Sequence, residues 1–535
     1  MHECRRLLIA DNLIDLWRDN LYRVGEGVTR CVSVVLLMLT NDGVPYVGWT
    51  GERFVSFLPE KMNRHGLIAG ATGTGKTVTC QMLAEIFSDL GSSVFLVDAK
   101  GDLTGMGQRG GNKSSVTKRV DQYGLRSEGY EEKGYPVRLW DPFGEQGTPM
   151  RMTISGIGPM LLERILELND VQSGLLEIAF RVADDNGLLL YDLKDLQAML
   201  HYLSEHRQEI SATYGNVSTA SVGAIQRSLL RLERQGGDRI FGMPDFDPKD
   251  LLTAEGRQGV INILEAKELM KSPRLYSSLL VWLLSSFYDN LPEVGDPDYP
   301  ALVFFFDEAH LLFDDINKPL LEKLTQVIKL IRSKGVGIYF ISQSPCDIPD
   351  EVLGQLGNKV VHALRAYTPS DMKRVRAAAD TFRPNPALDM METIQGLGTG
   401  EAVVSFLDDH GAPSISERVS VLPPQSYIGP LTDEERETLI RQSPLERVYR
   451  ESIDPRSAYE DLADREEQGR LEEQQRAEAE RRAKETKASA KSQQDDFSDL
   501  LGGILKSATR AMGSSAGREI TRSILGTLLG GKRRR

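Results

Sequence analysis

The chain has 535 residues, of which 40% are apolar, and its formal net charge at pH 7 is −13. This length and composition predict a folded core of enzyme size, built as one large or two ordinary domains. The negative charge excludes a protein coated in basic surface, so any contact with nucleic acid must come from a local groove or pore.

Nothing in the sequence predicts a membrane span or a secreted protein. The longest apolar run, residues 32–39, is far shorter than the roughly 20 residues that a membrane helix needs. Residues 1–19 mix charges of both signs with their apolar positions and form no convincing signal peptide. The four cysteines are too few and too scattered for a disulfide framework. We therefore expect a cytoplasmic protein without an integral membrane segment.

The pattern of apolar residues divides the first half of the chain into three segments. Residues 1–45 follow no sustained apolar period, and the status of this N-terminal segment stays open. From 46 to 150 the pattern is that of an α/β core, with a strand at 65–69, a glycine loop, a helix over 78–90 and a buried strand at 94–98. From 151 to 295 the apolar spacing is mainly helical, which predicts a helical insertion.

The α/β pattern resumes from 296 to 450. Strands are expected at 302–307, 336–342 and 359–364, a helix at 320–331, and a glycine turn that feeds a further strand at 396–407. Strands that alternate with helices predict a parallel sheet covered on both faces. The fold class is therefore α/β.

The last segment, 451–535, is rich in charge and has almost no apolar stripe. We expect a flexible C-terminal tail that is either a solvated single helix or a disordered arm. It ends in two short amphipathic pieces, 497–511 and 520–529, which could dock a protein partner or a membrane surface or remain weakly ordered.

One segment between a predicted strand and a predicted helix fits the pattern GxxxxGK[ST] of a phosphate-binding loop. Its residues are Gly70, Ala71, Thr72, Gly73, Thr74, Gly75, Lys76 and Thr77. The glycines let backbone N–H groups converge on phosphate oxygens, and the following helix adds its positive end. We expect Lys76 to reach the β and γ phosphates of ATP and the Thr77 hydroxyl to hold Mg²⁺.

Two adjacent carboxylates follow the apolar strand LVFFF. Asp307 ends this strand, which places it at the carboxyl edge of the sheet beside the glycine loop, where it can bind Mg²⁺. Glu308 is then placed to polarise the attacking water, although a helix N-terminal carboxylate would have the same sequence. The letters DEAH also occur in another helicase superfamily, but no QRxGRxGR element follows in this sequence.

Two further side chains are candidates for the hydrolytic site. Gln343 ends the next strand, where it can sense the γ phosphate or orient water, or simply form a turn. Arg332 precedes that strand and so lies at the opposite edge of the sheet. If it acts, it must act on the nucleotide of a neighbouring subunit in a ring. The alternative is a solvated arginine at a helix terminus.

These motifs resemble a known family. The order GATGTGKT, LVFFFDEAH, RSKGVGIYFISQSP, GNKVVHALRA and GLGTGEAVVSF is similar to that of the HerA/FtsK-like ring ATPases, and most similar to the bacterial HerA-like ATPases of the YjgR type. The resemblance covers residues 46–450. It implies a RecA-like P-loop core split by the insertion, and a hexamer.

For the site, the resemblance implies the nucleotide and magnesium roles given above, a sensor role for Gln343 and a role for Arg332 in the neighbouring site. Arg365 is a weaker candidate, because a structural arginine is equally compatible with its position. Motor proteins of this superfamily often carry an arginine after the sensor glutamine, and here Ser344 takes that place.

Two functions remain open on the sequence alone. The first is an ATPase motor that translocates DNA or acts as a helicase, for which the basic loop with Lys113, Lys118 and Arg119 could line a pore, although a solvated loop explains these residues as well. The second is a nucleotide-switched scaffold that recruits proteins through the helical insertion and the charged tail.

Overall fold

The computed structural model describes residues 44–295, 297–314 and 316–511. The chain divides into two compact units, one formed by Met1–Glu167 with Arg231–Ile453 and the other by Leu168–Leu230 with Asp454–Arg535. Nearly all of the N-terminal segment, and the second amphipathic piece of the tail, lie outside the described residues.

The centre of the first unit is a 12-stranded sheet, counted over the described residues, with the order β2-β1-β14-β13-β12-β3-β11-β10-β4-β9-β5-β6. From β12 to β6 in this order neighbouring strands pair in parallel, and from β2 to β12 they pair antiparallel. The mostly parallel α/β sheet that the sequence predicts is confirmed. Its strands are β1 Tyr46–Trp49, β2 Phe54–Ser56, β3 Gly66–Ala69, β4 Ser93–Asp98, β5 Val137–Asp141, β6 Thr148–Pro149, β9 Ile261–Glu265, β10 Leu302–Phe306, β11 Val336–Ser342, β12 Asn358–His362, β13 Glu401–Ser405 and β14 Glu417–Val421.

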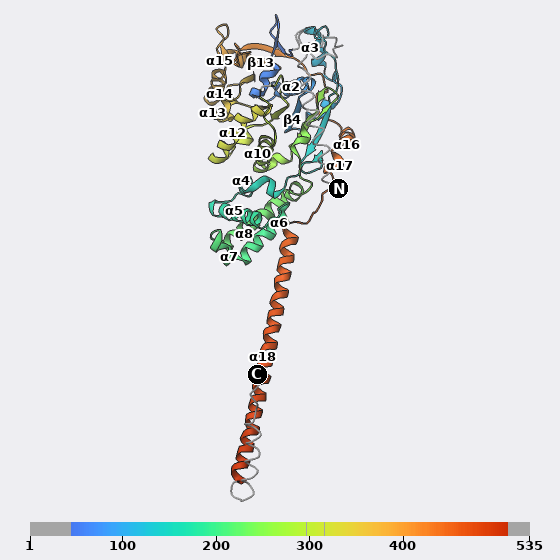
Figure 1. The fold of residues 1–535 in the computed structure, drawn as a ribbon. Helices are drawn as coiled ribbons and strands as arrows, with labels where there is room; N and C mark the ends of the chain where they lie inside the picture. The colour runs from blue at the N-terminus through green and yellow to red at the C-terminus, as the bar shows by residue number, and fades with distance from the viewer. Residues whose placement is uncertain (1–43, 296, 315, 512–535) are drawn as a thin grey trace. The chain divides into compact units, whose positions relative to one another are not determined.

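Helices cover both faces of this sheet (Figure 1). Successive side chains of a strand point to opposite faces. Accordingly Phe305 of β10 contacts Phe87 of α2, with ring centroids 6.1 Å apart, while Phe304 contacts Phe287 of α10 at 5.4 Å. Both faces of β10 are therefore buried, which explains why its sequence is a continuous apolar run.

One strand of the sheet, β9, was not expected from the sequence. The strand β9 lies between β4 and β5 in the sheet, although the sequence predicts a mainly helical insertion over residues 151–295. Its five residues, INILE, include the polar Asn262, whose amide donates to the backbone carbonyls of Val94 and Leu251. A short run interrupted by a polar residue gives no clear period, so only pairing with the neighbouring strands reveals it.

The remaining elements of the first unit are short or helical. A two-stranded ribbon, β7 Ala254–Glu255 and β8 Gln258–Gly259, precedes β9. The α-helices are α2 Lys76–Leu90, α3 Ser114–Gln122, α4 Ile154–Leu166, α9 Gly237–Ile240, α10 Pro273–Asn290, α11 His310–Phe313, α12 Lys318–Ile331, α13 Asp350–Leu353, α14 Pro369–Asp380, α15 Met390–Gly396, α16 Asp433–Gln442 and α17 Glu446–Tyr449. The 3₁₀ turns are η1 Pro59–Arg64, η2 Thr104–Gly107, η3 Pro248–Leu251, η4 Leu269–Lys271, η5 Arg332–Lys334 and η6 Pro345–Asp347.

The second unit is helical. It holds α5 Asp170–Asp185, α6 Leu193–Glu205, α7 Arg207–Thr213, most of α8 Thr219–Arg234, and α18 Ala458–Ala511. The start of α18 is fixed on α6 by the buried carboxylate of Asp195, which accepts hydrogen bonds from the Ser457 hydroxyl and, at 3.1 Å, from the Tyr459 N–H. For residues after 451 the sequence left open a single helix or a disordered arm. The structure shows the helix, α18, from Ala458 to Ala511.

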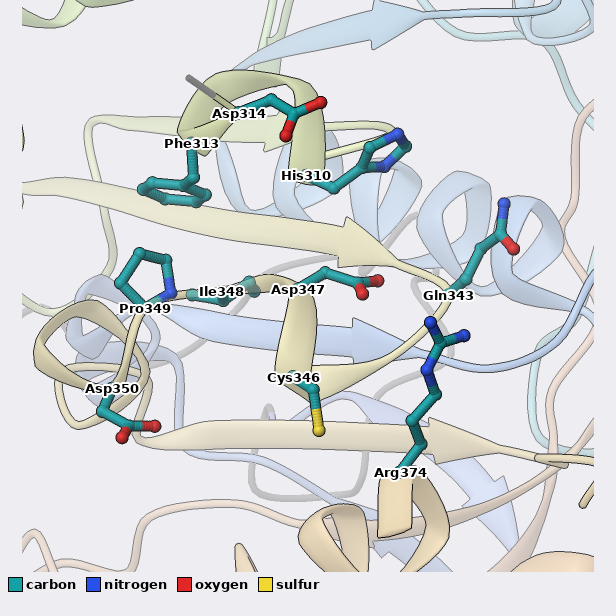
Figure 2. Close-up of a pocket in the computed structure, with 10 residues that line it drawn as sticks. All are labelled: His310, Phe313, Asp314, Gln343, Cys346, Asp347, Ile348, Pro349, Asp350 and Arg374. Carbon is teal, nitrogen blue, oxygen red and sulfur yellow. The ribbon is translucent and has the colours of Figure 1, made fainter. Parts of the chain in front are cut away.

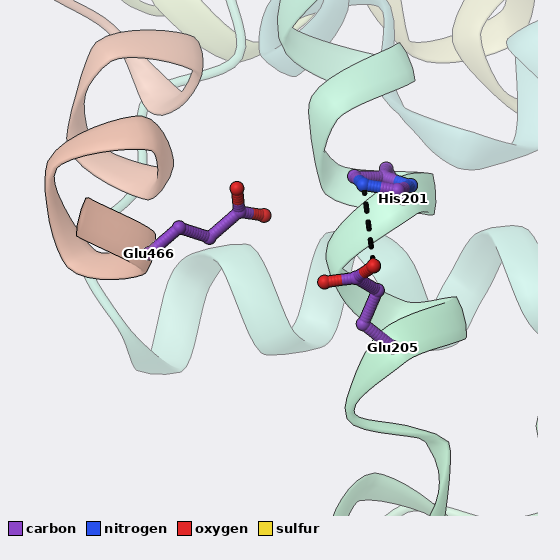
Figure 3. Close-up of side chains that lie close together, drawn as sticks. All are labelled: His201, Glu205 and Glu466. Atoms are coloured by element: carbon purple, nitrogen blue, oxygen red, sulfur yellow. Dashed lines mark ion pairs between the residues drawn. The ribbon is translucent and has the colours of Figure 1, made fainter. Parts of the chain in front are cut away.

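Three exposed side chains of this unit, His201, Glu205 and Glu466, lie close together across α6 and α18 (Figure 3). His201 and Glu205 form an ion pair of 3.6 Å with the i, i+4 spacing of an ordinary surface pair. Because each side chain is exposed, we assign the group no role. Among the described residues, no helix is both long enough and apolar enough to cross a membrane.

Candidate active site

The glycine-rich segment joins the end of β3 to the first residue of α2. All three of its glycines have a backbone conformation that disfavours other residues, with φ of 156° at Gly70, 77° at Gly73 and 122° at Gly75. A Cβ atom at Gly75 would lie 3.2 Å from Cα of Gly400 and 3.3 Å from Cε1 of His362. The loop therefore has the curled backbone that a phosphate-binding site needs, and it packs closely against Gly400 and His362.

Lys76 is the first residue of α2 and turns its ammonium group back over this loop. Its Nζ donates hydrogen bonds to the carbonyl oxygens of Gly70 at 2.6 Å and Ala71 at 3.3 Å. Burial lowers the pKa of Lys76, while the charges of Asp307 and Glu308 act in the opposite direction. The ammonium group is therefore held by two carbonyls that a phosphate could replace, beside two carboxylates.

The other residues of the loop divide into an exposed tip and a fixed base. Thr72 and Gly73 are exposed, whereas Thr74 is buried and donates its hydroxyl to the Ala71 carbonyl at 2.7 Å. Thr77 lies partly buried in the first turn of α2. The backbone of Gly70 and Ala71 continues the sheet by bonding to Ser342 and Ala363.

The two acids lie where the sequence predicts, directly after β10, which is separated from β3 only by β11. Burial and the neighbouring Glu308 raise the pKa of Asp307 to about 6. Its backbone carbonyl is fixed from α10, because the Tyr276 hydroxyl donates to it at 3.0 Å. The turn that follows β10 is thus held in place by a buried tyrosine that we did not foresee.

Glu308 has an unusual backbone conformation for a residue with a side chain, with φ of 48°. Such conformations are found at functional sites, where the surrounding structure imposes them. Within the described residues its Oε2 atom accepts no hydrogen bond, and Nδ1 of His310 lies 3.4 Å away. An oxygen that is buried and unsatisfied in this way is available to a ligand or to water.

The side chains fit the magnesium ion that the resemblance implies. Mg²⁺ prefers oxygen ligands and retains several waters. Thr77 offers a hydroxyl, and Asp307 offers a carboxylate of which Oδ1 accepts a bond from the N–H of Glu308 at 2.9 Å. The unsatisfied oxygen of Glu308 beside them suits an outer-sphere water. These metal-binding roles stay predictions.

Gln343 follows β11, at the same edge of the sheet as the loop and the acid pair. Its side chain is exposed and, together with His310 and Arg374, lines a cavity of about 660 Å³ (Figure 2). The next residue, Ser344, is buried and begins η6 by accepting a hydrogen bond from the Cys346 N–H at 3.2 Å. Ser344 is therefore a structural residue. The positively charged side chain that shares the cavity with Gln343 is Arg374 of α14.

Arg332 lies where the sequence predicts, at the opposite edge. It forms the start of η5, just before the first residue of β11, and is exposed. The seven residues of β11 separate it from Gln343, which is roughly 20 Å at the rise of a strand. Arg332 therefore stands far from the loop of its own subunit. Arg365, the weaker candidate, donates to the carbonyls of Gln395 and Leu397, as a structural arginine does.

Of the three basic residues proposed for a pore, Arg119 has a structural role. Its guanidinium donates to the carbonyls of Thr399 at 2.6 Å and Gly400 at 3.2 Å. The N–H of Gly400 in turn donates to the Thr74 carbonyl at 2.8 Å, so Arg119 supports the glycine-rich loop from α3. Lys113 and Lys118 are exposed and form no ion pair within the described residues. Only these two remain free to contact a polymer.

Lys100 is a second positive charge near the site that we did not foresee. It lies in the turn after β4, whose shape is fixed because Asp98 accepts the N–H groups of Lys100 at 3.1 Å and Gly101 at 2.8 Å. The charge of Lys100 lowers the pKa values of Lys76 and Asp307. Lys100 lies in the segment VDAKGDLTG, but the sequence gave no sign that it is near the acids. The parallel pairing of β4 with β10 brings the turn that contains Lys100 next to Asp307.

His362, at the end of β12, supports the loop from below. Its Nδ1 donates to the Glu401 carbonyl at 2.9 Å, so the ring is neutral and its Nε2 accepts from the Thr79 hydroxyl at 2.8 Å. Burial lowers the pKa of His362 to about 4. The sequence predicts a strand over 359–364, and a single histidine within that apolar stretch gave no sign of this role.

This histidine predicts a loss of stability in acid. Because its pKa is about 4 in the folded protein and about 6.5 when unfolded, the unfolded chain binds more protons between these values. Stability is complete above pH 6.5 and is lost as the pH falls toward 4, by about 2 kcal/mol at pH 5. We expect His362→Asn, which cannot titrate, to lose about 2 kcal/mol less than the parent between pH 7.5 and 5.0.

Urea unfolding followed by tryptophan fluorescence measures this difference, because Trp49, Trp140 and Trp282 all lie in the first unit. His410→Asn is the matched control, since the side chain of His410 is 86% exposed. Equal losses in the parent and in His362→Asn would show that His362 is not held neutral.

The chain is similar in sequence to known proteins. The family model described as helicase HerA-like C-terminal matches residues 50–535. The chain is 23% identical over 356 residues to the DNA double-strand break repair helicase HerA of Sulfurisphaera tokodaii, covering 64% of this chain and 62% of that protein. It is 20% identical over 409 residues to the protein of the same name from Pyrococcus furiosus, covering 71% of each.

Among solved structures, the plasmid coupling protein TrwB in complex with the non-hydrolysable GTP analogue GDPNP matches with 16% identity and a TM-score of 0.47, covering 77% of this chain and 94% of that chain. The chain spans about three fifths of the length of the S. tokodaii relative.

Proposed function

We propose that this chain, which belongs to the helicase HerA-like C-terminal family, binds ATP at residues 70–77 and hydrolyses it with the help of Glu308. The observation that carries the proposal is the arrangement around Lys76, whose ammonium group bonds to the loop carbonyls of Gly70 and Ala71 and interacts with the charges of Asp307 and Glu308. A nucleotide triphosphate brings the negative charge that this ammonium group then binds.

The reaction follows from the placement of the groups. Loop N–H groups and Lys76 bind the β and γ phosphates. Thr77 and Asp307 would hold the magnesium ion, which would neutralise charge on the phosphate oxygens. Glu308 accepts a proton from water as the water oxygen bonds to the γ phosphorus. The bond to the β–γ bridging oxygen breaks, and ADP and phosphate are the products.

We further propose that the active form is a ring of six identical subunits, in which Arg332 reaches the nucleotide of a neighbour. The position of Arg332 at the edge opposite to its own loop supports this. Electron microscopy of the ATP-bound protein tests the assembly. A closed hexamer with Arg332 at the neighbouring nucleotide is the expected image, and monomers under all conditions would contradict it.

The substrate that we propose is DNA, along which the ring moves as a translocase or helicase. Two of the relatives are named as DNA double-strand break repair helicases, and Lys113 and Lys118 supply exposed, unpaired charge on an otherwise acidic chain. Contacts of lysine with phosphates weaken steeply with salt. ATP turnover should therefore rise when DNA is added at low salt, and the rise should shrink as salt increases.

The second candidate is a nucleotide-switched scaffold for protein partners. It is supported by α18, whose charged side chains are exposed from 465 to 486 and form i, i+4 pairs such as Arg481 with Glu485. The same measurement separates the two functions. Turnover that neither single-stranded nor double-stranded DNA changes at any salt concentration would favour the scaffold.

A further inference from the structure

The cavity beside Gln343 contains an arginine that none of the functions above uses. Arg374 lies on α14 and lines the cavity together with Gln343 and His310. Figure 2 shows its guanidinium extending toward the end of β11, where Gln343 stands. Within residues 44–295, 297–314 and 316–511, neither Arg374 nor Gln343 forms a hydrogen bond or an ion pair. Both polar groups are therefore available to a ligand.

The sheet order places Gln343 at the same edge of the sheet as the phosphate-binding loop and the acid pair. β11 lies between β3, which leads into the phosphate-binding loop, and β10, which leads into Asp307 and Glu308. The strands are parallel, so all three carboxyl ends meet at one edge. A γ phosphate held by Lys76 would face Gln343, the residue that directly follows the middle strand. The cavity opens from that point.

The position of Arg374 is fixed by its surroundings. α14 begins with a capping box, in which Thr368 and Asp371 bond to each other's backbone N–H groups, and it packs against η6, the turn that follows Gln343. A guanidinium at this place presents several N–H donors in a rigid fork, which matches the oxygens of a phosphate.

Three carboxylates also line the cavity, and they leave the arginine free. Asp347 accepts hydrogen bonds from the Ser342 hydroxyl and from the Ser344 N–H, so it belongs to the turn after β11. Asp350 lies on the far side of the cavity from Gln343 in Figure 2, and neither it nor Asp314 forms an ion pair with Arg374.

We propose that Arg374 is a catalytic residue that binds the γ phosphate in its own subunit, next to Gln343. The inference rests on the proposed ATPase function and adds to it the group that distinguishes ATP from ADP. An arginine that reaches the γ phosphate stabilises the charge of the transition state. Its contact with the nucleotide ends when the γ phosphate leaves, so ADP does not make this contact.

The test compares Arg374→Ala and Arg374→Lys with Arg376→Ala. Arg376 is an exposed arginine of the same helix that does not line the cavity, which makes it a matched control. We expect Arg374→Ala to lower kcat for ATP about 100-fold, to weaken binding of ATPγS about 10-fold and to leave ADP binding unchanged. Arg374→Lys should recover only part of kcat, because an ammonium group lacks the planar fork. Arg376→Ala should behave as the parent.

The outcomes separate the inference from the function on which it rests. If the parent hydrolyses ATP and Arg374→Ala equals Arg376→Ala, the inference is overturned and the ATPase stands. If Arg374→Ala weakens ATPγS and ADP equally and lowers the thermal midpoint, its role is structural and the inference is again overturned. If the parent binds ATPγS without turnover, the proposed hydrolysis fails, and the ratio of ATPγS to ADP affinity still decides for or against Arg374.

Mixing two inactive proteins tests whether the arginine acts within its own subunit. A Lys76→Ala subunit retains Arg374, so it would restore turnover to an Arg374→Ala subunit only if the arginine acted on a neighbour. We expect no restoration, and restored turnover would overturn the assignment to one subunit.

Discussion

Replacing Lys76 by alanine should abolish measurable ATP hydrolysis and weaken nucleotide binding. The variant removes the one ammonium group that lies over the loop, where it bonds to Gly70 and Ala71. Loss of a preorganised group that stabilises transition-state charge costs about 10²–10³ in kcat, and here it also removes a charge from the ground-state complex. Steady-state phosphate release and ATPγS titration measure the two effects.

The fold should survive this change. Asp307 loses the neighbouring charge of Lys76, but it keeps the hydrogen bond from the N–H of Glu308 and the positive charge of Lys100. Lys323→Ala is the control, because Lys323 is exposed on α12. Unchanged binding and turnover in Lys76→Ala would remove the basis for every function proposed here.

Replacing Glu308 by glutamine should give a protein that binds ATP and hardly hydrolyses it. The amide keeps the size of the side chain but cannot accept the proton of the attacking water. General base catalysis contributes about 10²–10⁴ to the rate, so kcat should fall by that factor. Single-turnover hydrolysis and ATPγS affinity distinguish this loss from a loss of binding.

The Glu308→Gln exchange should change catalysis without changing the stability of the fold. Because the Oε2 atom of Glu308 has no hydrogen-bond partner among the described residues, the exchange breaks no hydrogen bond there and weakens only the contact with Nδ1 of His310, so we expect thermal stability to change little. Glu322→Gln, on the exposed face of α12, controls for the loss of charge. A Glu308→Gln variant with the turnover of the parent would assign the base to another residue.

The parts of the fold that the sequence predicts share one property, which is a strong local pattern. β4, β10 and β11 are long apolar runs because both faces of the central strands are buried, and α2 follows a loop whose glycines allow few other shapes. The elements that were missed have weak patterns. β9 is interrupted by Asn262, and α3 is polar except for the apolar face formed by Val116 and Val120.

The same division holds for the candidate site. The sequence alone determined the loop from Gly70 to Thr77 and the acid pair, because their chemistry depends on residues adjacent in the chain. Only the tertiary structure decided that Arg119 and His362 support that loop, that Arg374 lines the cavity beside Gln343, and that Arg332 lies at the opposite edge of the sheet. These residues meet through the pairing of β12, β3 and β11 and through the packing of α14 on η6, contacts between distant parts of the chain that no local spacing records.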